Sequence, residues 1–540
     1  MPFARKAILA CLASASLVLV AAPGAYAAHD MQAMFQDDNQ LIYTTPAAQS
    51  HTLDILKSLG VQRIRVTIVW RAIAPSPMSA SKPSFNAADP AEYPPGAWDH
   101  YDSLVKLAVA HNIKVNFNPT APAPNWATGT PDRADIDQTF DPNPKEFGLF
   151  MVALARRYTG LYKPPGATVA LPRVNYWSIW NEPNQAGWLT PQWAIDPRPG
   201  AGMVETAPQI YRSLVDAAWT ALQGTGHAKD TILIGETAPK GSKGAQGETK
   251  SLDALAFIRE LYCVDKNLQI YIGSSATVRG CPVGADARQK FVSDHPGLFQ
   301  ASGWAHHPYE LIFSPNTKPG YKDWATIANL PALSKLLRRV HQRYGQTAGN
   351  GGNIPLYLTE FGYQTNPPDP LAVSPAHQAA WINQAEYIAY SNKYVRTLSQ
   401  FLLVDDKPLQ GVPTTSPSAW TTFQSGLVNL NGSHKPSFDA YRFPIYLPHH
   451  TATRKGRLRV WGNPRMAGGG LVRTVVVEAR QNGRKAFKKI GQLKTDELRG
   501  YVDGRVTVHH AGVLRLRWQD PVTKAIYRSR VVPYALAKKH

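Results

Sequence analysis

After its N-terminus, the sequence lacks any segment that approaches the roughly 20 uninterrupted apolar residues of a membrane-spanning helix. The one apolar run, Ala7 to Ala22, follows Arg5 and Lys6 and precedes the small-residue pattern Ala25-Tyr26-Ala27. This order is typical of a secretory signal peptide, residues 1–27, cleaved after Ala27. It predicts a secreted, extracellular or cell-surface protein with no membrane partner after cleavage. The alternative is a retained N-terminal anchor.

Cysteine is also scarce, with three residues in the chain. Cys11 belongs to the expected signal peptide, so Cys263 and Cys281 remain, 18 positions apart. An even pair suits an oxidising compartment. A disulfide between them would stabilise the fold by about 3 kcal/mol. Two unpaired thiols remain an alternative, because the sequence does not show whether their Cα atoms come within bridging distance.

Acidic residues are few toward the C-terminus, where residues 451–540 hold 21 Lys and Arg against 5 Asp and Glu. This excess of +16 makes up most of the formal net charge of +20. Residues 28–450 hold 35 basic against 33 acidic residues, so a nearly neutral body carries a basic C-terminal part. Uneven charge and a length of 540 residues predict at least two domains.

The chain changes character beyond Lys435 to Pro448, where short alternating apolar runs begin. They predict a small all-β sandwich of immunoglobulin-like type over residues 449–540. The expected strands are Leu458–Trp461, Thr474–Ala479, Arg505–His509, Val513–Trp518 and Ile526–Val532. Its Lys and Arg excess suits an anionic cell-wall or matrix polymer, whereas a solvated accessory domain is the alternative. Nucleic acid is not an expected partner of an exported protein.

Short apolar strands alternate with helical patterns over residues 28–448. Eight strands are expected: Met31–Gln36, Arg63–Trp70, Ile113–Asn118, Val174–Trp180, Thr231–Gly235, Gly303–His307, Pro355–Thr359 and Leu398–Val404. Helices are expected over Trp98–His111 and from Ser374-Pro375 onward. Eight such units predict an α/β fold, the closed (β/α)₈ TIM barrel, with its site at the carboxyl ends of the strands. A doubly wound open sheet is disfavoured, because no Gly-rich phosphate-binding loop follows an early strand.

Two glutamates follow barrel strands directly. Glu182 closes the fourth strand in SIWNEPN, and Glu360 closes the seventh in LYLTEFGYQT. Both would therefore lie at the top of the barrel and face each other. Cleavage of a glycosidic bond needs such a pair, since one acid protonates the leaving oxygen while the other attacks or activates water. We expect the rings of Trp177 and Trp180 to keep one of the acids protonated. A helix cap or surface residue is the alternative for either glutamate.

The motifs WNEPN and LTEFG closely resemble glycoside hydrolase clan A, in particular the cellulase-like family 5 and the related family 39. The resemblance covers roughly residues 30–445 and implies that Glu182 is the general acid/base and Glu360 the nucleophile. It also implies substrate-binding roles for neighbouring polar residues, namely Asn181, Arg65 in RIRVTIVW, and His307 and Tyr309 in GWAHHPY. It implies a reaction without a cofactor.

Arg65 and Asn181 also have physical reasons to belong to the site. The charge of Arg65 would favour an ionised Glu360, and Asn181 would donate to a sugar hydroxyl. Arg65 could instead pair with a structural acid. His306 and His307 raise the question of a metal, but adjacent residues on a strand point to opposite faces and no third ligand is evident. No metal is expected.

Tryptophans and further acids follow several strands. Trp126, Trp188 and Trp420 lie in loops after the third, fourth and eighth strands, where a flat ring can support a sugar, although ordinary packing is an alternative for each. Other acids in similar positions are expected to bind substrate or to fix loops: Asp37, Asp38, Glu236, Asp405 and Asp406. Glu236 is the strongest rival for a catalytic role.

Taken together, the residues predict a secreted retaining glycoside hydrolase that cleaves a poly- or oligosaccharide, with the two carboxyl groups ~5 to 5.5 Å apart. The alternative is a non-catalytic carbohydrate-binding or wall-associated protein on the same scaffold. The choice of sugar depends on loops. Three long segments are expected to wall the cleft and to decide between exo and endo action: Ile73–Gly96, Gly187–Pro208 and Gly241–Leu252.

Overall fold

A computed structural model describes residues 27–347 and 352–537 of the chain. The predicted signal peptide, apart from its last residue, lies outside the described residues. None of the described helices combines the length and apolarity needed to cross a bilayer.

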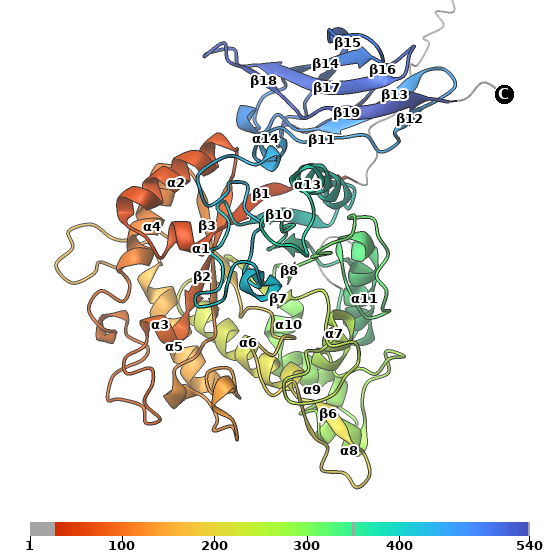
Figure 1. The fold of residues 1–540 in the computed structure, drawn as a ribbon. Coiled ribbons are helices and arrows are strands. Elements are labelled where there is room, and N and C mark those ends of the chain that lie inside the picture. Colours follow the sequence, from red (N-terminus) through yellow and green to blue (C-terminus); the bar gives the residue numbers. More distant parts are fainter. Residues whose placement is uncertain (1–26, 348–351, 538–540) are drawn as a thin grey trace, which may run out of the picture.

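Eight parallel strands close into a barrel in the order expected for (β/α)₈ (Figure 1). They are β1 (Gln32–Gln36), β2 (Arg63–Val69), β3 (Lys114–Thr120), β4 (Tyr176–Ser178), β7 (Thr231–Thr237), β8 (Gly303–His306), β9 (Leu356–Leu358) and β10 (Val395–Phe401). Each strand pairs in parallel with its neighbours, and β10 pairs with β1 to complete the ring. The predicted TIM barrel and all eight of its strands are confirmed.

Helices surround the barrel and follow the strands in alternation. The main ones are α2 (Pro46–Ser58), α4 (Asp99–Ala110), α5 (Pro144–Arg157), α6 (Ala207–Gly224), α7 (Ala254–Leu261), α11 (Leu330–Arg343), α13 (Pro375–Tyr390) and α14 (Pro436–Arg442). Shorter ones are α1 (Asp38–Leu41), α3 (Trp70–Ile73), α8 (Gly273–Thr277), α9 (Ala287–Asp294) and α10 (Pro296–Gln300), and β5 (Trp193–Ile195) and β6 (Met203–Glu205) form a small hairpin. The predicted start of α13 is confirmed, because Ser374 accepts from the backbone of His377 and Pro375 occupies the first turn.

The last barrel strand ends three residues before the predicted Val404. Leu402 takes a φ of +71°, and the N–H groups of Leu403 and Val404 donate to the carboxylate of Asp37, at 2.9 and 3.1 Å. The apolar run Leu398–Val404 therefore continues past the strand, and Asp37 ties its end to the end of β1.

The C-terminal part is a β-sandwich, as predicted, that packs beside α13 and α14 (Figure 1). One sheet holds β11 (Ile445–Tyr446), β13 (Arg457–Gly462) and β16 (Val502–Thr507). The other holds β12 (Thr451–Ala452), β14 (Thr474–Gln481), β15 (Lys488–Lys494), β17 (Gly512–Gln519), β18 (Ile526–Arg528) and β19 (Val532–Leu536). Since β11 pairs with β13, the sandwich begins before the predicted boundary at residue 449.

The predicted strand Ile526–Val532 is two strands. Between β18 and β19, Ser529 donates its backbone N–H to Leu516, and the guanidinium of Arg530 turns away to Asn383 on α13, at 2.9 Å. β18 and β19 therefore pair one after the other with the same edge of β17, and the residues between them contact the barrel domain.

Candidate active site

Glu182 and Glu360 meet at the carboxyl ends of the barrel strands, as predicted. Glu182 follows β4 and Glu360 follows β9, two positions beyond its end. A carboxylate oxygen of Glu182 lies within 4.8 Å of one of Glu360. Two residues that are 178 positions apart in the chain thus face a common point, because parallel strands of a closed barrel end at one face.

The backbone is in an uncommon conformation around Glu182 and at Glu236. Trp180, Glu182 and Glu236 have φ angles of +64°, +38° and +45°. Non-glycine residues rarely adopt this region, and such strain collects at functional sites. The backbone N–H of Glu182 donates to the carbonyl of Glu236 at 2.9 Å, so the turn after β4 is held against β7.

Glu360 accepts hydrogen bonds on both oxygens. Arg65 donates to Oε1 at 2.6 Å, and the hydroxyl of Tyr309 donates to Oε2 at 3.1 Å. Burial raises the pKa of Glu360 above its ordinary range, although His307 and Arg65 act in the opposite direction. The predicted contact between Arg65 and Glu360 is confirmed.

His307 lies between three carboxylates. Its Nδ1 is 2.8 Å from Oε1 of Glu182 and 3.6 Å from Oε2 of Glu360, and its Nε2 is 2.7 Å from Oε2 of Glu236. Burial acts to lower the pKa of His307, but the three carboxylates raise it to about 10. With a carboxylate oxygen at hydrogen-bond distance from each nitrogen, the surroundings favour an imidazolium that donates on both sides.

Arg65 is fully buried beneath the two acids and binds several oxygens at once. Besides Glu360, it donates to Asn181 Oδ1 at 2.6 Å and to Glu236 Oε2 at 2.9 Å. Asn181 lines the cavity described below, and because its oxygen accepts from Arg65, its NH₂ group is the one oriented to donate to a ligand. This arrangement fits the role expected for Asn181.

A cavity of about 640 Å³ opens above the acids. Of the predicted site residues, Asn181, Glu182, Trp188, Tyr309, Glu360 and Trp420 line it. Trp126 does not: its ring packs edge-on against Trp70 and Phe85, and its Nε1 donates to Pro75. Trp126 is thus a packing residue, the alternative that the sequence left open.

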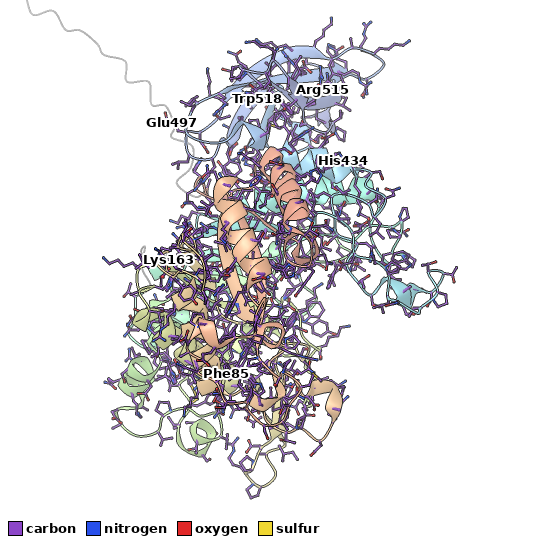
Figure 2. All side chains as sticks on the ribbon, turned by 90° about the vertical axis from the view of Figure 1, so that its left-hand side faces the viewer. Phe85, Lys163, His434, Glu497, Arg515 and Trp518 are labelled. Atoms are coloured by element: carbon purple, nitrogen blue, oxygen red, sulfur yellow. A yellow bond between two sulfur atoms is a disulfide. The ribbon has the colours of Figure 1, made fainter. Side chains whose placement is uncertain are left out.

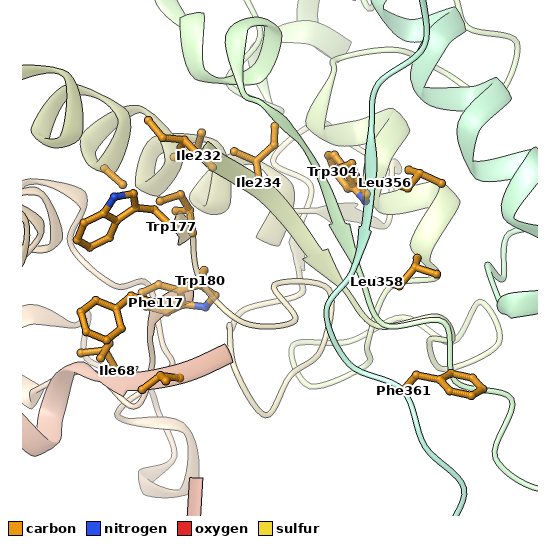
Figure 3. Close-up of a cluster of buried hydrophobic side chains, with 14 of the residues drawn as sticks. Ile68, Phe117, Trp177, Trp180, Ile232, Ile234, Trp304, Leu356, Leu358 and Phe361 are labelled. Carbon is orange, nitrogen blue, oxygen red and sulfur yellow. The ribbon is translucent and has the colours of Figure 1, made fainter. Parts of the chain in front are cut away.

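The expectation that Trp177 and Trp180 surround an acid is wrong. Both rings point into the hydrophobic layer between barrel and helices, as Figure 3 shows. Trp177 packs against Phe117, and Trp180 packs against Phe147 of α5. Alternation along β4 places Tyr176 and Trp177 on opposite faces, and the positive φ of Trp180, beyond the end of the strand, turns its ring to the same side as that of Trp177.

The other acids at the strand ends have separate roles. Asp37 and Asp405 fix loops: Asp37 accepts from the loop after β10, and Asp405 pairs with Lys435 at 2.6 Å. Asp38 and Asp406 line the cavity. Glu236 is fully buried below it, within β7, and burial acts to raise its pKa, but Arg65 and His307 outweigh this and lower it to about 2.

The donor atoms of Glu182, His307 and Glu360 lie within 4.8 Å of one another, a spacing that a metal ion could span. The imidazole does not fit such a role, because both of its nitrogens face carboxylate oxygens and carry hydrogens, whereas a ligand must offer a lone pair. His306 points elsewhere, with Nδ1 near Thr237 and Nε2 near Ala325. The two adjacent histidines thus face opposite sides, as expected.

Several residues that shape the site were not predicted. Polar side chains in buried strands are the signal that could have revealed them, because a polar group inside a barrel needs a partner. They are Gln36, Asn118 and Thr359, all of which hydrogen-bond to Arg65 or Glu236.

No protein-family model matches the chain, and no curated protein matches it. Solved structures of similar fold include a family 39 glycoside hydrolase from Bacteroides cellulosilyticus WH2 (14% identity, 89% of this chain and 80% of that chain, TM-score 0.44). A second is a glucosidase from Croceicoccus marinus, with 11% identity over 93% of this chain and 100% of that chain and a TM-score of 0.44. A third is a monomeric β-xylosidase from Caulobacter crescentus CB15, with 14% identity over 89% of this chain and 96% of that chain and a TM-score of 0.44. Likeness this distant carries no argument about activity.

Proposed function

We propose that the protein is a retaining glycoside hydrolase that cleaves O-glycosidic bonds of a poly- or oligosaccharide by double displacement. The observation that carries the proposal is the separation of Glu182 and Glu360, whose closest approach is within 4.8 Å. Retaining enzymes hold their two carboxyl groups ~5 to 5.5 Å apart, whereas inverting enzymes need about 6.5 to 9.5 Å to admit water between them.

The surroundings of the two acids support different roles for them. Glu360 accepts from Arg65 and Tyr309, donors that stabilise a carboxylate, so it attacks the anomeric carbon. Glu182 lines the open cavity and protonates the leaving oxygen as the bond to the anomeric carbon breaks. In the second step Glu182 takes a proton from water, which releases the sugar from Glu360.

A non-catalytic carbohydrate-binding protein is the competing proposal, because fold alone does not establish activity. The buried cluster of charges below the cavity counts against it, since a binder gains nothing from acids that are costly to desolvate. Incubation with a panel of aryl glycosides separates the two. We expect colour release by the wild type and none by Glu360→Gln; carbohydrate binding without release by either protein would favour the binder.

We further propose that the protein is exported and processed after Ala27. Support comes from Cys263 and Cys281, which form a disulfide with Cα atoms 6.0 Å apart, as is usual in an oxidising compartment. The intact mass of the protein recovered from culture medium tests the proposal. A mature chain beginning at Ala28 is expected, and an uncleaved chain would contradict it.

A second function that we propose, for the sandwich, is the binding of an acidic polysaccharide. Side chains alternate along its strands, so one outer face of β14, β15, β17 and β18 gathers six cations: Arg480, Lys489, Lys494, Arg515, Arg517 and Arg528. Glu478 is the acid paired within this face, and it contacts Arg515 and Arg517 at 2.8 Å each. Figure 2 shows Arg515 on the sandwich, far from Phe85 in the barrel domain. Six cations against one carboxylate leave a net positive face.

Retention on immobilised polygalacturonate, with dextran as the neutral control, tests this function. We expect retention that weakens as salt rises, because exposed charges are screened. Lys489→Glu combined with Arg528→Glu should elute earlier than the matched double variant Lys163→Glu with Lys229→Glu, whose lysines lie in the barrel domain. Equal elution of the two variants, or tighter binding to duplex DNA than to the polysaccharide, would contradict it.

A further inference from the structure

The buried cluster beneath the cavity has a balanced set of charges. Arg65 and His307 supply two positive charges, and Glu236 and Glu360 supply two negative ones. Glu182 can then hold the proton that it donates without leaving the cluster charged. Glu236 does not line the cavity and so does not touch the substrate, yet it contacts both cations through one oxygen, Oε2.

We propose that Glu236 is a positioning residue, a fixed counter-ion that keeps His307 protonated so that the imidazolium can serve whichever of Glu182 and Glu360 is ionised. This inference rests on the proposed function for the roles of those two acids. It assigns Glu236 a role that does not require contact with the sugar.

The geometry around Nδ1 of His307 fits this role. Nδ1 lies 2.8 Å from Glu182, to which its N–H donates, and 3.6 Å from Glu360, which is close enough for an ion pair but not for a hydrogen bond. When Glu360 attacks, its negative charge is consumed in the new ester bond. Glu182 gives its proton to the leaving oxygen and becomes the carboxylate. The charge of the cluster is unchanged, and the imidazolium remains beside the acid that carries the negative charge.

Glu236 is placed so that its own charge is constant through the cycle. It accepts from Arg65 at 2.9 Å, from His307 at 2.7 Å and from the hydroxyl of Thr359 at 2.8 Å. Arg65 and His307 hold its pKa at about 2 against the effect of burial. A carboxylate so held stays ionised throughout the neutral range.

Several charged and titratable groups face His307, and each favours or opposes its protonation. Glu182, Glu236 and Glu360 favour the imidazolium. Arg65, which binds Glu236 and Glu360, offsets part of their effect. Tyr309 lies edge-on at 6.4 Å between ring centroids, and the neighbouring His306 is kept neutral by burial, which lowers its pKa to about 4.

The experiment is a titration of the His307 imidazole by ¹⁵N NMR, with the signal assigned from a His307→Asn variant among the 16 histidines. In the wild type we expect a doubly protonated ring throughout the neutral range, with neutral His306 as the internal reference. A neutral His307 at pH 7 would overturn the proposal. This measurement needs no substrate.

Glu236→Gln should lower the pH at which His307 loses its proton by about 1 to 3 units, the usual effect of one nearby opposite charge. The alkaline limb of kcat should move down by the same amount. Thr359→Val is the matched control, because it removes a hydrogen bond to Oε2 of Glu236 without removing charge. It should leave the pKa of His307 and the alkaline limb of kcat unchanged. The proposal would be overturned if Glu236→Gln left the pKa of His307 unchanged, or if Glu236→Gln and Thr359→Val lowered it equally. If Glu182→Gln and Glu360→Gln kept their turnover, the proposed function would fail whatever the titration gives.

Discussion

At the scale of single residues, the two acids differ in their hydrogen-bond donors. Glu360 receives one hydrogen bond on each oxygen, from Arg65 and Tyr309, whereas Glu182 contacts His307 through Oε1. A nucleophile must be ionised and held in place, while an acid/base must keep one oxygen free for the leaving group. The donor pattern therefore separates the two roles more clearly than the positions of the acids do.

The roles predict different responses to the leaving group. Glu182→Gln should lose about 10²- to 10⁴-fold in kcat/KM on glycosides with poor leaving groups, because protonation contributes that much. It should lose far less on aryl glycosides whose phenolate leaves without a proton. Glu360→Gln should be inactive on both classes. The measurement is kcat/KM across a series of leaving-group pKa values, and identical slopes for the wild type and Glu182→Gln would remove the acid role from Glu182.

The pKa of Glu360 predicts the acid limb of the pH profile. Burial raises this pKa above its ordinary range. Since only the carboxylate attacks, a raised pKa moves the loss of activity to higher pH. As the pH is lowered, we expect kcat/KM to fall at a pH above that at which an ordinary exposed glutamate is protonated. Tyr309→Phe, which removes one donor to the carboxylate, should shift the limb further upward, and a downward shift would contradict the assignment.

Motifs in the sequence predicted that Glu182 and Glu360 would meet at the top of the barrel together with four further residues, and the structure places them together: Arg65, Asn181, His307 and Tyr309. The pattern was readable because all but Arg65, which lies within β2, end a strand or follow one closely. Their catalytic and substrate-binding roles stay predictions. The positions of rings could not be predicted in the same way. Trp177 and Trp180 flank the site in the sequence but point into the helix layer. Which face a residue occupies depends on where the strand bends, and the positive φ of Trp180 breaks the regular alternation.

At the scale of elements, strand number and order followed from the alternation of apolar and helical patterns, but some strand ends did not. β10 ends where Leu402 turns and Asp37 captures two backbone N–H groups, and Asp37 lies 366 positions away from Leu403. β15, with the sequence KKIGQLK, was not predicted at all, because its side chains are largely exposed and charged. Such ends and edges depend on partners that are distant in the chain.

The disulfide predicts a local gain in stability. Cys263 follows α7, and Cys281 follows α8, so the bridge closes a loop of 18 positions within the long connection between β7 and β8. Closing a loop of this size stabilises by about 3 kcal/mol, chiefly by restricting the unfolded chain. Cys263→Ala with Cys281→Ala should therefore unfold at lower denaturant concentration than the wild type. The reduced wild type should unfold at the same denaturant concentration as the variant. Equal unfolding midpoints for the oxidised wild type and the variant would contradict this estimate.

At the scale of the whole molecule, barrel and sandwich share a buried interface. Arg465 of the sandwich pairs with Glu386 of α13 at 2.6 Å, and both side chains are about 6% exposed. Trp461 and Tyr501 of the sandwich pack with Tyr390 of α13 in the same hydrophobic cluster as the barrel. We infer that the sandwich is a fixed part of the molecule and not a flexibly tethered module.

The interface predicts that the two domains unfold together. Glu386→Gln leaves the charge of Arg465 buried without its counter-ion, which should cost about 3 to 5 kcal/mol. Asp439→Asn is the control, because the Arg442–Asp439 pair lies at the surface and such pairs contribute about 0 to 1 kcal/mol. Calorimetry should show one transition that Glu386→Gln shifts as a whole. Two transitions, with only one of them shifted, would show independent domains.

The stereochemistry of the first product tests the central claim most directly. Once a cleaved glycoside is found, ¹H NMR during the first turnovers reports the anomer released before mutarotation. Two carboxylates as close as Glu182 and Glu360 leave no room for water between them and the sugar, so the account predicts that the released sugar keeps the configuration of the substrate. An inverted anomer would show that water attacks directly, and would contradict the double displacement through Glu360.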